Sequence, residues 1–62
     1  MARYIVWWST GRADGDSLYD DLASAESRFE DVIARPDIIE AEITDKDGNI
    51  VKRYDYGVTT TR

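Results

Sequence analysis

The chain has 62 residues, no cysteine, no histidine and a formal net charge of −5. A chain of this length forms one domain with a small core, and such domains usually gain stability from a disulfide, a metal or a partner chain. The composition excludes disulfides, removes the usual zinc ligands and argues against binding to nucleic acid phosphates, which leaves a second protein chain as the expected partner.

No stretch of the sequence has the pattern of a signal peptide or approaches the roughly 20 apolar residues of a membrane-spanning helix. The absence of cysteine also suits a reducing compartment. We therefore expect a cytoplasmic protein without a membrane partner.

The longest apolar run is the stretch YIVWW near the N-terminus, which contains both tryptophans. Its aromatic and β-branched residues predict the first strand. Side chains alternate in a strand, so Tyr4, Val6 and Trp8 face one way while Ile5 and Trp7 face the other. One of these faces can serve the core, and the other needs a different cover.

Residues 9–16 are polar, contain two glycines and predict a loop. Ser17 is a suitable N-cap, and the apolar residues that follow it recur at spacings of three and four. Because Pro36 disfavours helical geometry at the preceding residue, the helix should end near Ala34. The sequence thus predicts one helix over about 17–34.

Two further strands are predicted in the C-terminal half of the chain. Residues 38–44 alternate between apolar and polar types, and the glycine-containing stretch 45–49 is a hairpin connection to a third strand over 50–56. Residues 57–62 are expected to be a frayed tail of the single domain, which spans 1–62.

Two registers of this hairpin are open. A two-residue turn pairs Ile43 with Lys52 and places Tyr54 and Tyr56 beneath the helix. A type I turn with a bulged glycine pairs Ile43 with Val51 and places both tyrosines on the opposite face. The Asp-x-Asp-Gly-Asn sequence of the turn slightly favours the second register.

The element order β-α-β-β predicts a small two-layer α+β domain, with a three-stranded sheet and one helix on one face. Placing the third strand between the other two gives an antiparallel sheet of order 1-3-2, which we prefer to the alternative order 1-2-3. One helix covers one face only, so apolar residues of the first strand should remain exposed on the other face. Contiguous exposed apolar surface usually marks an interaction site.

Candidate protein-binding residues are the strand aromatics with their apolar neighbours, which can anchor a partner, and helix acids, which can steer a basic one. Between Asp14 and Asp47 lie twelve acidic and three basic residues, a balance of −9, against +4 over the remaining positions. The candidates are Tyr4, Val6, Trp7, Trp8, Tyr54, Tyr56, Asp20, Glu26, Glu30 and Asp31.

Catalysis is not expected, because histidine and cysteine are absent and so few elements cannot build a deep pocket. Residues 45–49 do not form a calcium loop, because the glycine is at the fourth position of the stretch and not at the sixth. Gly11 and Gly15 lack the Gly-Lys-Ser/Thr sequence of a phosphate loop. We therefore predict no enzyme, no cofactor and no metal site.

These features favour a non-enzymatic protein-interaction module. In length, charge and predicted element order, the chain resembles small acidic proteins of bacteriophage genomes, several of which inhibit host defence or host enzymes. The resemblance implies an inhibitor, encoded by a phage or mobile element, that binds a basic nucleic-acid-binding or defence protein in the host cytoplasm, as anti-CRISPR and anti-restriction proteins do.

We also expect a homodimer. Two alternative functions stay open. One is a self-assembling structural homo-oligomer, and the other is a nucleic-acid or small-ligand binder that uses the strand aromatics. Direct binding to nucleic acid is disfavoured by the net negative charge.

Overall fold

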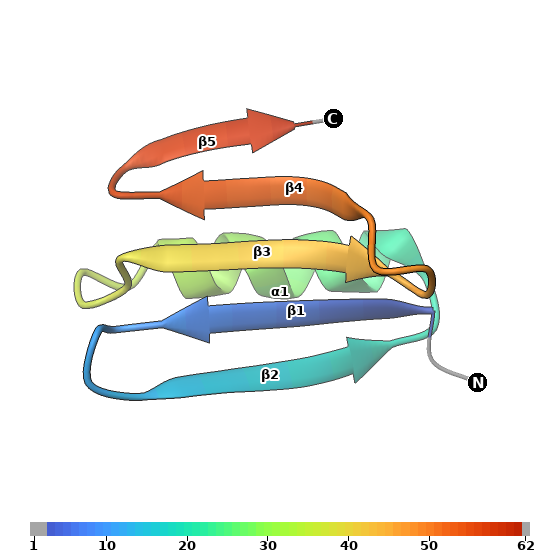
Figure 1. The fold of residues 1–62 in the computed structure, drawn as a ribbon, viewed down its shortest axis with the longest axis horizontal. Helices are drawn as coiled ribbons and strands as arrows, with labels where there is room; N and C mark the ends of the chain where they lie inside the picture. Colours follow the sequence, from blue (N-terminus) through green and yellow to red (C-terminus); the bar gives the residue numbers. More distant parts are fainter. Residues whose placement is uncertain (1–2, 62) are drawn as a thin grey trace.

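The computed structural model describes residues 3–61 and contains, within them, five strands and one helix (Figure 1). Two strands precede the helix and three follow it. The elements are β1 (Tyr4–Ser9), β2 (Asp14–Tyr19), α1 (Leu22–Ile33), β3 (Glu40–Asp45), β4 (Ile50–Asp55) and β5 (Val58–Thr61).

The strands form one antiparallel sheet in the order β2-β1-β3-β4-β5 (Figure 1). From β2 at one edge, the chain crosses through α1 and returns to the sheet as β3, on the far side of β1. The domain is α+β with one helix, but the predicted three-stranded β-α-β-β sheet of order 1-3-2 is wrong. Two strands, β2 and β5, were missing from it.

β2 forms where the sequence predicted a loop and the start of the helix. Asp14, Gly15 and Asp16 are poor strand formers, so the segment does not predict a strand by itself. It is a strand because it pairs with β1 along its whole length. The hairpin that joins them is closed by the N–H of Thr10, which donates to the Ala13 carbonyl at 2.9 Å.

α1 begins at Leu22 and not at the predicted Ser17. Its N-cap is Asp21, whose carboxylate accepts a hydrogen bond from the backbone N–H of Ser24 at 2.7 Å. This hydrogen bond favours the charged carboxylate and lowers the pKa of Asp21 below its ordinary value. The helix ends at Ile33, before the proline that was predicted to terminate it.

The β3–β4 turn has the chemistry of the second predicted register. The N–H of Asp45 donates to the Asn49 carbonyl at 2.9 Å, and the N–H of Gly48 donates to the Asp45 carbonyl at 3.0 Å. Gly48 has a φ of +83°, a left-handed conformation that glycine adopts without the steric penalty of a side chain. The turn sequence thus specifies a turn with a bulged glycine, as predicted.

A β-bulge in β4 then shifts the pairing by one residue. Ile43 lies opposite Lys52, as in the first predicted register, so Val51 is the extra residue of the bulge. The favoured pairing of Ile43 with Val51 is therefore wrong. Beyond the bulge, Tyr54 lies on the helix side of the sheet and packs against the core.

β5 follows β4 through a tight turn at Tyr56 and Gly57, whose φ values are +47° and +91°. Positive φ at both central residues is typical of the type I′ turn that joins two-residue hairpins. The sequence predicted a frayed tail over 57–62, whereas Val58–Thr61 form an edge strand with all four residues exposed. The last residue of that predicted tail, Arg62, lies outside the described residues.

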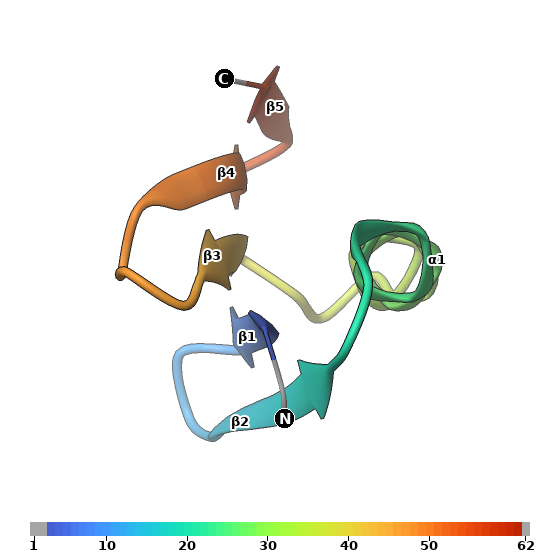
Figure 2. The ribbon, with the colours of Figure 1, turned by 90° about the vertical axis from the view of Figure 1, so that its right-hand side faces the viewer.

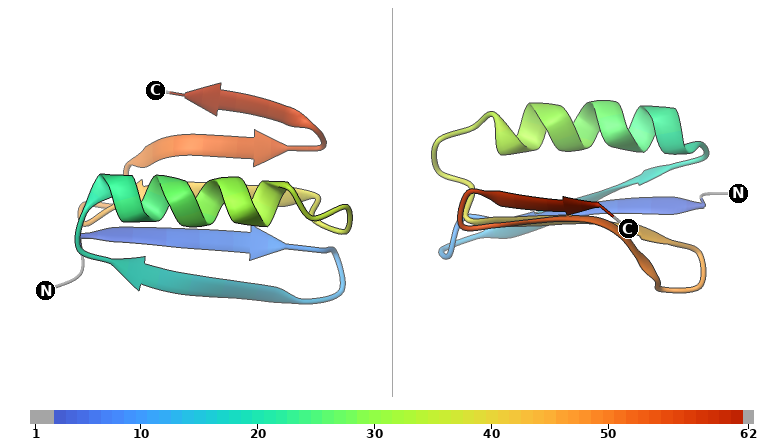
Figure 3. Two further views of the ribbon diagram at one scale, coloured as in Figure 1. Left: turned by 180° about the vertical axis from the view of Figure 1, so that it is seen from behind. Right: turned by 90° about the horizontal axis from the view of Figure 1, so that it is seen from above.

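α1 packs on one face of the sheet, over β1, β2 and β3 (Figure 2, Figure 3). Val6 and Ile43 lie opposite each other on β1 and β3 and are fully buried beneath the helix. The buried core residues come from both layers and from the segment after the helix: Val6, Ala25, Phe29, Val32, Ile38, Ala41 and Ile43. Among residues 3–61, no element covers the other face of the sheet, which we call the open face.

Candidate functional site

Strand alternation decides which side chains reach the open face. In β1, Tyr4, Val6 and Trp8 pack toward α1, whereas Ile5 and Trp7 point to the open face. The sequence predicted this division but left open which tryptophan belongs to which side. The structure places Trp8 against the core and Trp7 on the open face.

Apolar side chains cross one end of the open face in a line, which we call the apolar row. Leu18, Ile5 and Ile50 expose 63%, 37% and 42% of their surface. Single exposed aliphatic residues are common, but three of them on one line, with only Thr44 between Ile5 and Ile50, are typical of an interaction surface. The row runs over four adjacent strands through Leu18, Ile5, Thr44 and Ile50.

Trp7 lies next to the apolar row, near the middle of the open face. Its neighbours in the adjoining strands are Asp16 of β2 and Glu42 of β3. Glu42 accepts a hydrogen bond from the Arg53 guanidinium at 3.0 Å, which forms an ion pair on β3 and β4. Trp7 is half-buried and does not pack against the core, so a partner can cover its exposed part.

Carboxylates surround Trp7 on the open face and outnumber the bases. Arg53 is paired with Glu42, so the described strand residues give this face an excess of four acids over cations and a negative charge. Oδ1 of Asp55 is buried and accepts no hydrogen bond from residues 3–61, which is an unfavourable state for a polar atom. Among the strand residues within 3–61 that lie on this face, the acids are Asp14, Asp16, Glu40, Glu42 and Asp55, and the one base is Arg53.

The structure separates the aromatic residues that the sequence nominated for binding. Trp7 is on the open face, and Tyr56 is in the β4–β5 turn with 72% of its surface exposed. The others lie on the helix side of the sheet, where Val6 is fully buried. The helix-side residues are Tyr4, Val6, Trp8 and Tyr54.

The nominated acidic residues lie in or beside the helix layer and not on the open face. Glu26 and Glu30 are ion-paired to Lys52 of β4, at 3.4 and 3.8 Å. Asp31 is exposed on α1, and Asp20 is exposed in the connection between β2 and α1. The acids that adjoin Trp7 therefore come from the strands.

Trp8 is held on the helix side of the sheet by contacts with Gly15 and Arg35. A Cβ on Gly15 would lie only 2.6 Å from Cζ2 of Trp8, so the indole rests directly on the glycine backbone. The Arg35 guanidinium carbon lies 5.2 Å from the centroid of the same indole, within the range of a cation–π interaction. These contacts tie β1 to β2 and to the segment that follows α1.

Leu18, Asp14 and Asp16 were not predicted as residues of this face, because the sequence pattern assigned residues 14–18 to a loop and a helix. The available signal was the alternation in DGDSLY, where Asp14, Asp16 and Leu18 occupy one face of a strand. That signal is weak, because aspartate and glycine are depleted in strands.

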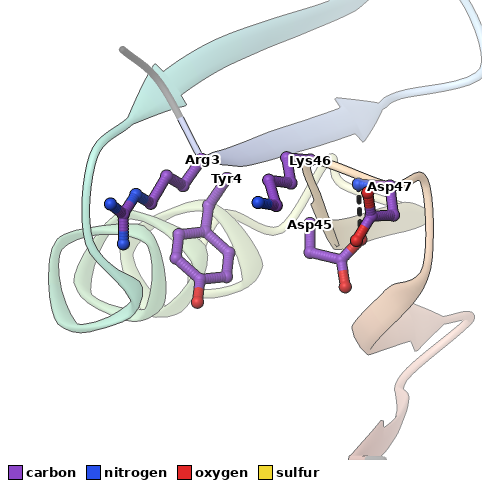
Figure 4. A pocket seen from close by; sticks show the side chains of 5 residues that line it. All are labelled: Arg3, Tyr4, Asp45, Lys46 and Asp47. Carbon is purple, nitrogen blue, oxygen red and sulfur yellow. Dashed lines mark hydrogen bonds between the residues drawn. The ribbon is translucent and has the colours of Figure 1, made fainter.

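A shallow pocket of about 190 Å³ lies where β1 begins beside the β3–β4 turn (Figure 4). Its volume is below the roughly 300–1,000 Å³ of typical small-molecule sites. The Asp45 carboxylate at its wall already accepts a hydrogen bond from the Asp47 N–H at 2.9 Å. The pocket is lined by Arg3, Tyr4, Asp45, Lys46 and Asp47, and we assign no ligand to it.

Residues 3–61 contain no group of three or more acidic side chains placed to hold a metal ion. In the same part of the chain, no helix has the length and apolar character needed to cross a membrane. Comparisons with protein-family models, with curated proteins and with solved structures find no match. The open face is therefore the candidate site on the evidence of its own residues.

Proposed function

We propose that the protein is a non-enzymatic interaction module that binds a basic protein surface on its open face. The supporting observation is that the apolar row, Trp7 and five carboxylates share one uncovered face of the sheet. Desolvated aromatic and aliphatic side chains supply affinity, and the surrounding carboxylates select a positively charged partner.

The same charge disfavours two other uses of this face. Two copies that docked open face to open face would oppose an excess of four carboxylates on each side, and like charges in an interface are strongly unfavourable. Nucleic acid phosphates would meet the same repulsion. The charge therefore supports a basic protein as the occupant over a second copy or an oligonucleotide.

A finer form of the proposal names the class of partner. Surfaces that bind nucleic acid are rich in lysine and arginine, so an acidic face complements them. In this form, the protein is an inhibitor encoded by a phage or mobile element. It acts in the host cytoplasm, where its open face competes with nucleic acid for a host nucleic-acid-binding or defence protein.

Capture from bacterial lysate with matched baits tests the proposal. The baits are the wild type, the open-face variants Trp7→Ser and Asp16→Lys, and the control Asp31→Lys. The control makes the same charge change as Asp16→Lys, but at an exposed position on α1. We expect a basic protein that is captured by the wild type and the control and is lost with both open-face variants.

The captured protein is then purified and titrated by calorimetry at several salt concentrations. We expect Asp16→Lys to weaken binding by at least about tenfold, or ~1.4 kcal/mol, and salt to weaken wild-type binding. Equal capture by all four baits, or loss with Asp31→Lys alone, contradicts the proposal.

The inhibitor form has a separate assay. The wild type should displace a labelled oligonucleotide from the captured protein, and Trp7→Ser should not. If the complex forms but the oligonucleotide stays bound, the interaction module is retained and the inhibitor form is rejected.

A further inference from the structure

β5 forms one edge of the sheet, and some of its backbone groups are directed away from β4. The N–H of Tyr56 donates to the Ile39 carbonyl at 2.8 Å, and this pair sets the alternation of hydrogen bonds along β4 and hence along β5. In that alternation, the N–H and C=O groups of Thr59 and Thr61 point out of the sheet. The edge therefore presents two donors and two acceptors at a regular spacing.

The opposite edge, β2, is protected against pairing. The hydrogen bond between Thr10 and Ala13 sets the alternation in the first hairpin, so the backbone groups of Asp14, Asp16 and Leu18 point outward. Two carboxylates thus stand beside the outward backbone groups of this edge. Charged side chains are a usual protection of edge strands, because they repel an added strand of like charge.

β5 has no such protection. Its sequence, Val-Thr-Thr-Thr, has high strand propensity and contains no charge, proline or glycine. The cations beside it on β4 are neutralised, because Lys52 pairs with Glu26 at 3.4 Å and Arg53 pairs with Glu42 at 3.0 Å. Two copies of this edge can approach each other without strong repulsion.

We propose that β5 pairs with β5 of a second copy, antiparallel, around a two-fold axis at Thr60. In this register Thr59 lies opposite Thr61 of the second copy, so their outward N–H and C=O groups exchange two hydrogen bonds, and symmetry repeats this pair. Thr60 lies opposite its own counterpart, and cross-strand threonine pairs are favourable. The occupant is a second copy because this short, uncharged edge is complementary to itself.

The dimer goes beyond the proposed function and does not depend on it. The two-fold axis is perpendicular to the sheet, so the two five-stranded sheets join into one and both open faces lie on the same side. A partner with two basic sites could then bind both open faces, with a gain in avidity. β1 and β3, which correspond to the first two strands predicted from the sequence, offer no edge for such pairing, because both are interior strands.

Amide hydrogen exchange combined with sedimentation equilibrium tests the pairing, over protein concentrations from about 10 μM to about 1 mM. We expect the mass to rise from 7.1 kDa toward twice that value. The amides of Thr59 and Thr61 should gain protection as the mass rises. The amides of Val58 and Thr60 are directed to β4 and should be protected at every concentration.

Variants of the edge sharpen the test. Thr59→Pro removes an outward donor and leaves the ladder with β4 intact, so we expect the dimer dissociation constant to rise about tenfold or more. Thr59→Val keeps the donor and the strand propensity and is the matched control. Thr60→Lys places two ammonium groups at the axis and should weaken the dimer even if Thr59→Pro disturbs the fold.

Three outcomes overturn the proposal. The first is a mass of 7.1 kDa up to about 1 mM, with the Thr59 and Thr61 amides exchanging freely. The second is a dimer in which these two amides stay unprotected, because another surface then forms it. The third is protection that appears only when a different protein is added, which identifies the edge as a site for a partner's strand.

Discussion

Replacing Gly15 by alanine tests the contact that ties β2 to Trp8. Gly15 is not among the glycines with a positive φ, so its backbone conformation admits alanine. The added Cβ, however, would lie 2.6 Å from Cζ2 and 2.9 Å from Cε2 of the Trp8 indole. The indole is a flat, rigid group that packs against the core and lies 5.2 Å from the Arg35 guanidinium, so its freedom to move is limited.

The expected loss of stability in Gly15→Ala follows from these distances. Carbon atoms in good contact lie about 3.5–4.0 Å apart, so the indole or the strand must shift by about 1 Å. Overpacking of this kind costs about 1–3 kcal/mol of the free energy of unfolding. In a domain of this size, each kcal/mol lowers the Tm by about 4–8 °C. We therefore expect Gly15→Ala to be clearly destabilised.

The effect of Gly15→Ala on the free energy of unfolding should change sign when Trp8 is replaced by leucine. Without the indole, alanine meets no ring, and Gly15→Ala should stabilise the fold by about 0.4–1 kcal/mol because it restricts the unfolded chain. The measurement is urea denaturation, followed by far-UV circular dichroism, of the wild type, both single variants and the double variant. We expect a coupling free energy between the two substitutions of at least about 1.4 kcal/mol. Equal effects of Gly15→Ala in both backgrounds would refute the reasoning.

Three further changes have expected results. The Asp21 carboxylate has a lowered pKa in the folded protein. Its contribution to the free energy of unfolding is therefore present above its ordinary pKa of 3.8 and is lost as the pH falls through its pKa in the folded protein. The urea midpoint of Asp21→Asn should therefore fall less steeply below about pH 4 than that of the wild type, and identical slopes would exclude this role. Gly48→Ala should cost about 1 kcal/mol in thermal denaturation, because φ is +83° there, whereas Gly48→Asn should cost less. Lys52→Met should change stability by less than about 1 kcal/mol, because the Glu26 and Glu30 carboxylates that it leaves are partly exposed. A loss above about 2 kcal/mol in Lys52→Met would show that the ion pairs matter more than their exposure implies.

The open face is exposed because residues 3–61 contain one helix, which covers only the other face of the sheet. α1 covers β1, β2 and β3 on one side, and among residues 3–61 no second helix covers the other side (Figure 3). Trp7 and the apolar row therefore have no internal cover, although their residue types would suit a core. This is the physical reason for the proposed partner, and the carboxylates of the same face are the reason to propose that it is basic.

Local features of the chain were predictable from the sequence. The YIVWW run predicted a strand that divides its side chains between two faces, and the spacing of apolar residues predicted the buried stripe of the helix. Pro36 predicted where the helix ends, and the turn residues predicted the bulged glycine at Gly48. These features depend on interactions within a few residues, which propensity and periodicity report directly.

The tertiary structure decided the features that depend on distant residues. Residues 14–19 become a strand because an interior strand such as β1 needs a neighbour on each side for its backbone groups, and that gain outweighs the poor propensity of Asp14 and Gly15. The bulge at Val51 brings Tyr54 to the helix side, against the preference of the turn alone. The position of α1 then settles that Trp8 serves the core and Trp7 the open face, because a strand's alternation defines two faces but only packing decides which one is buried.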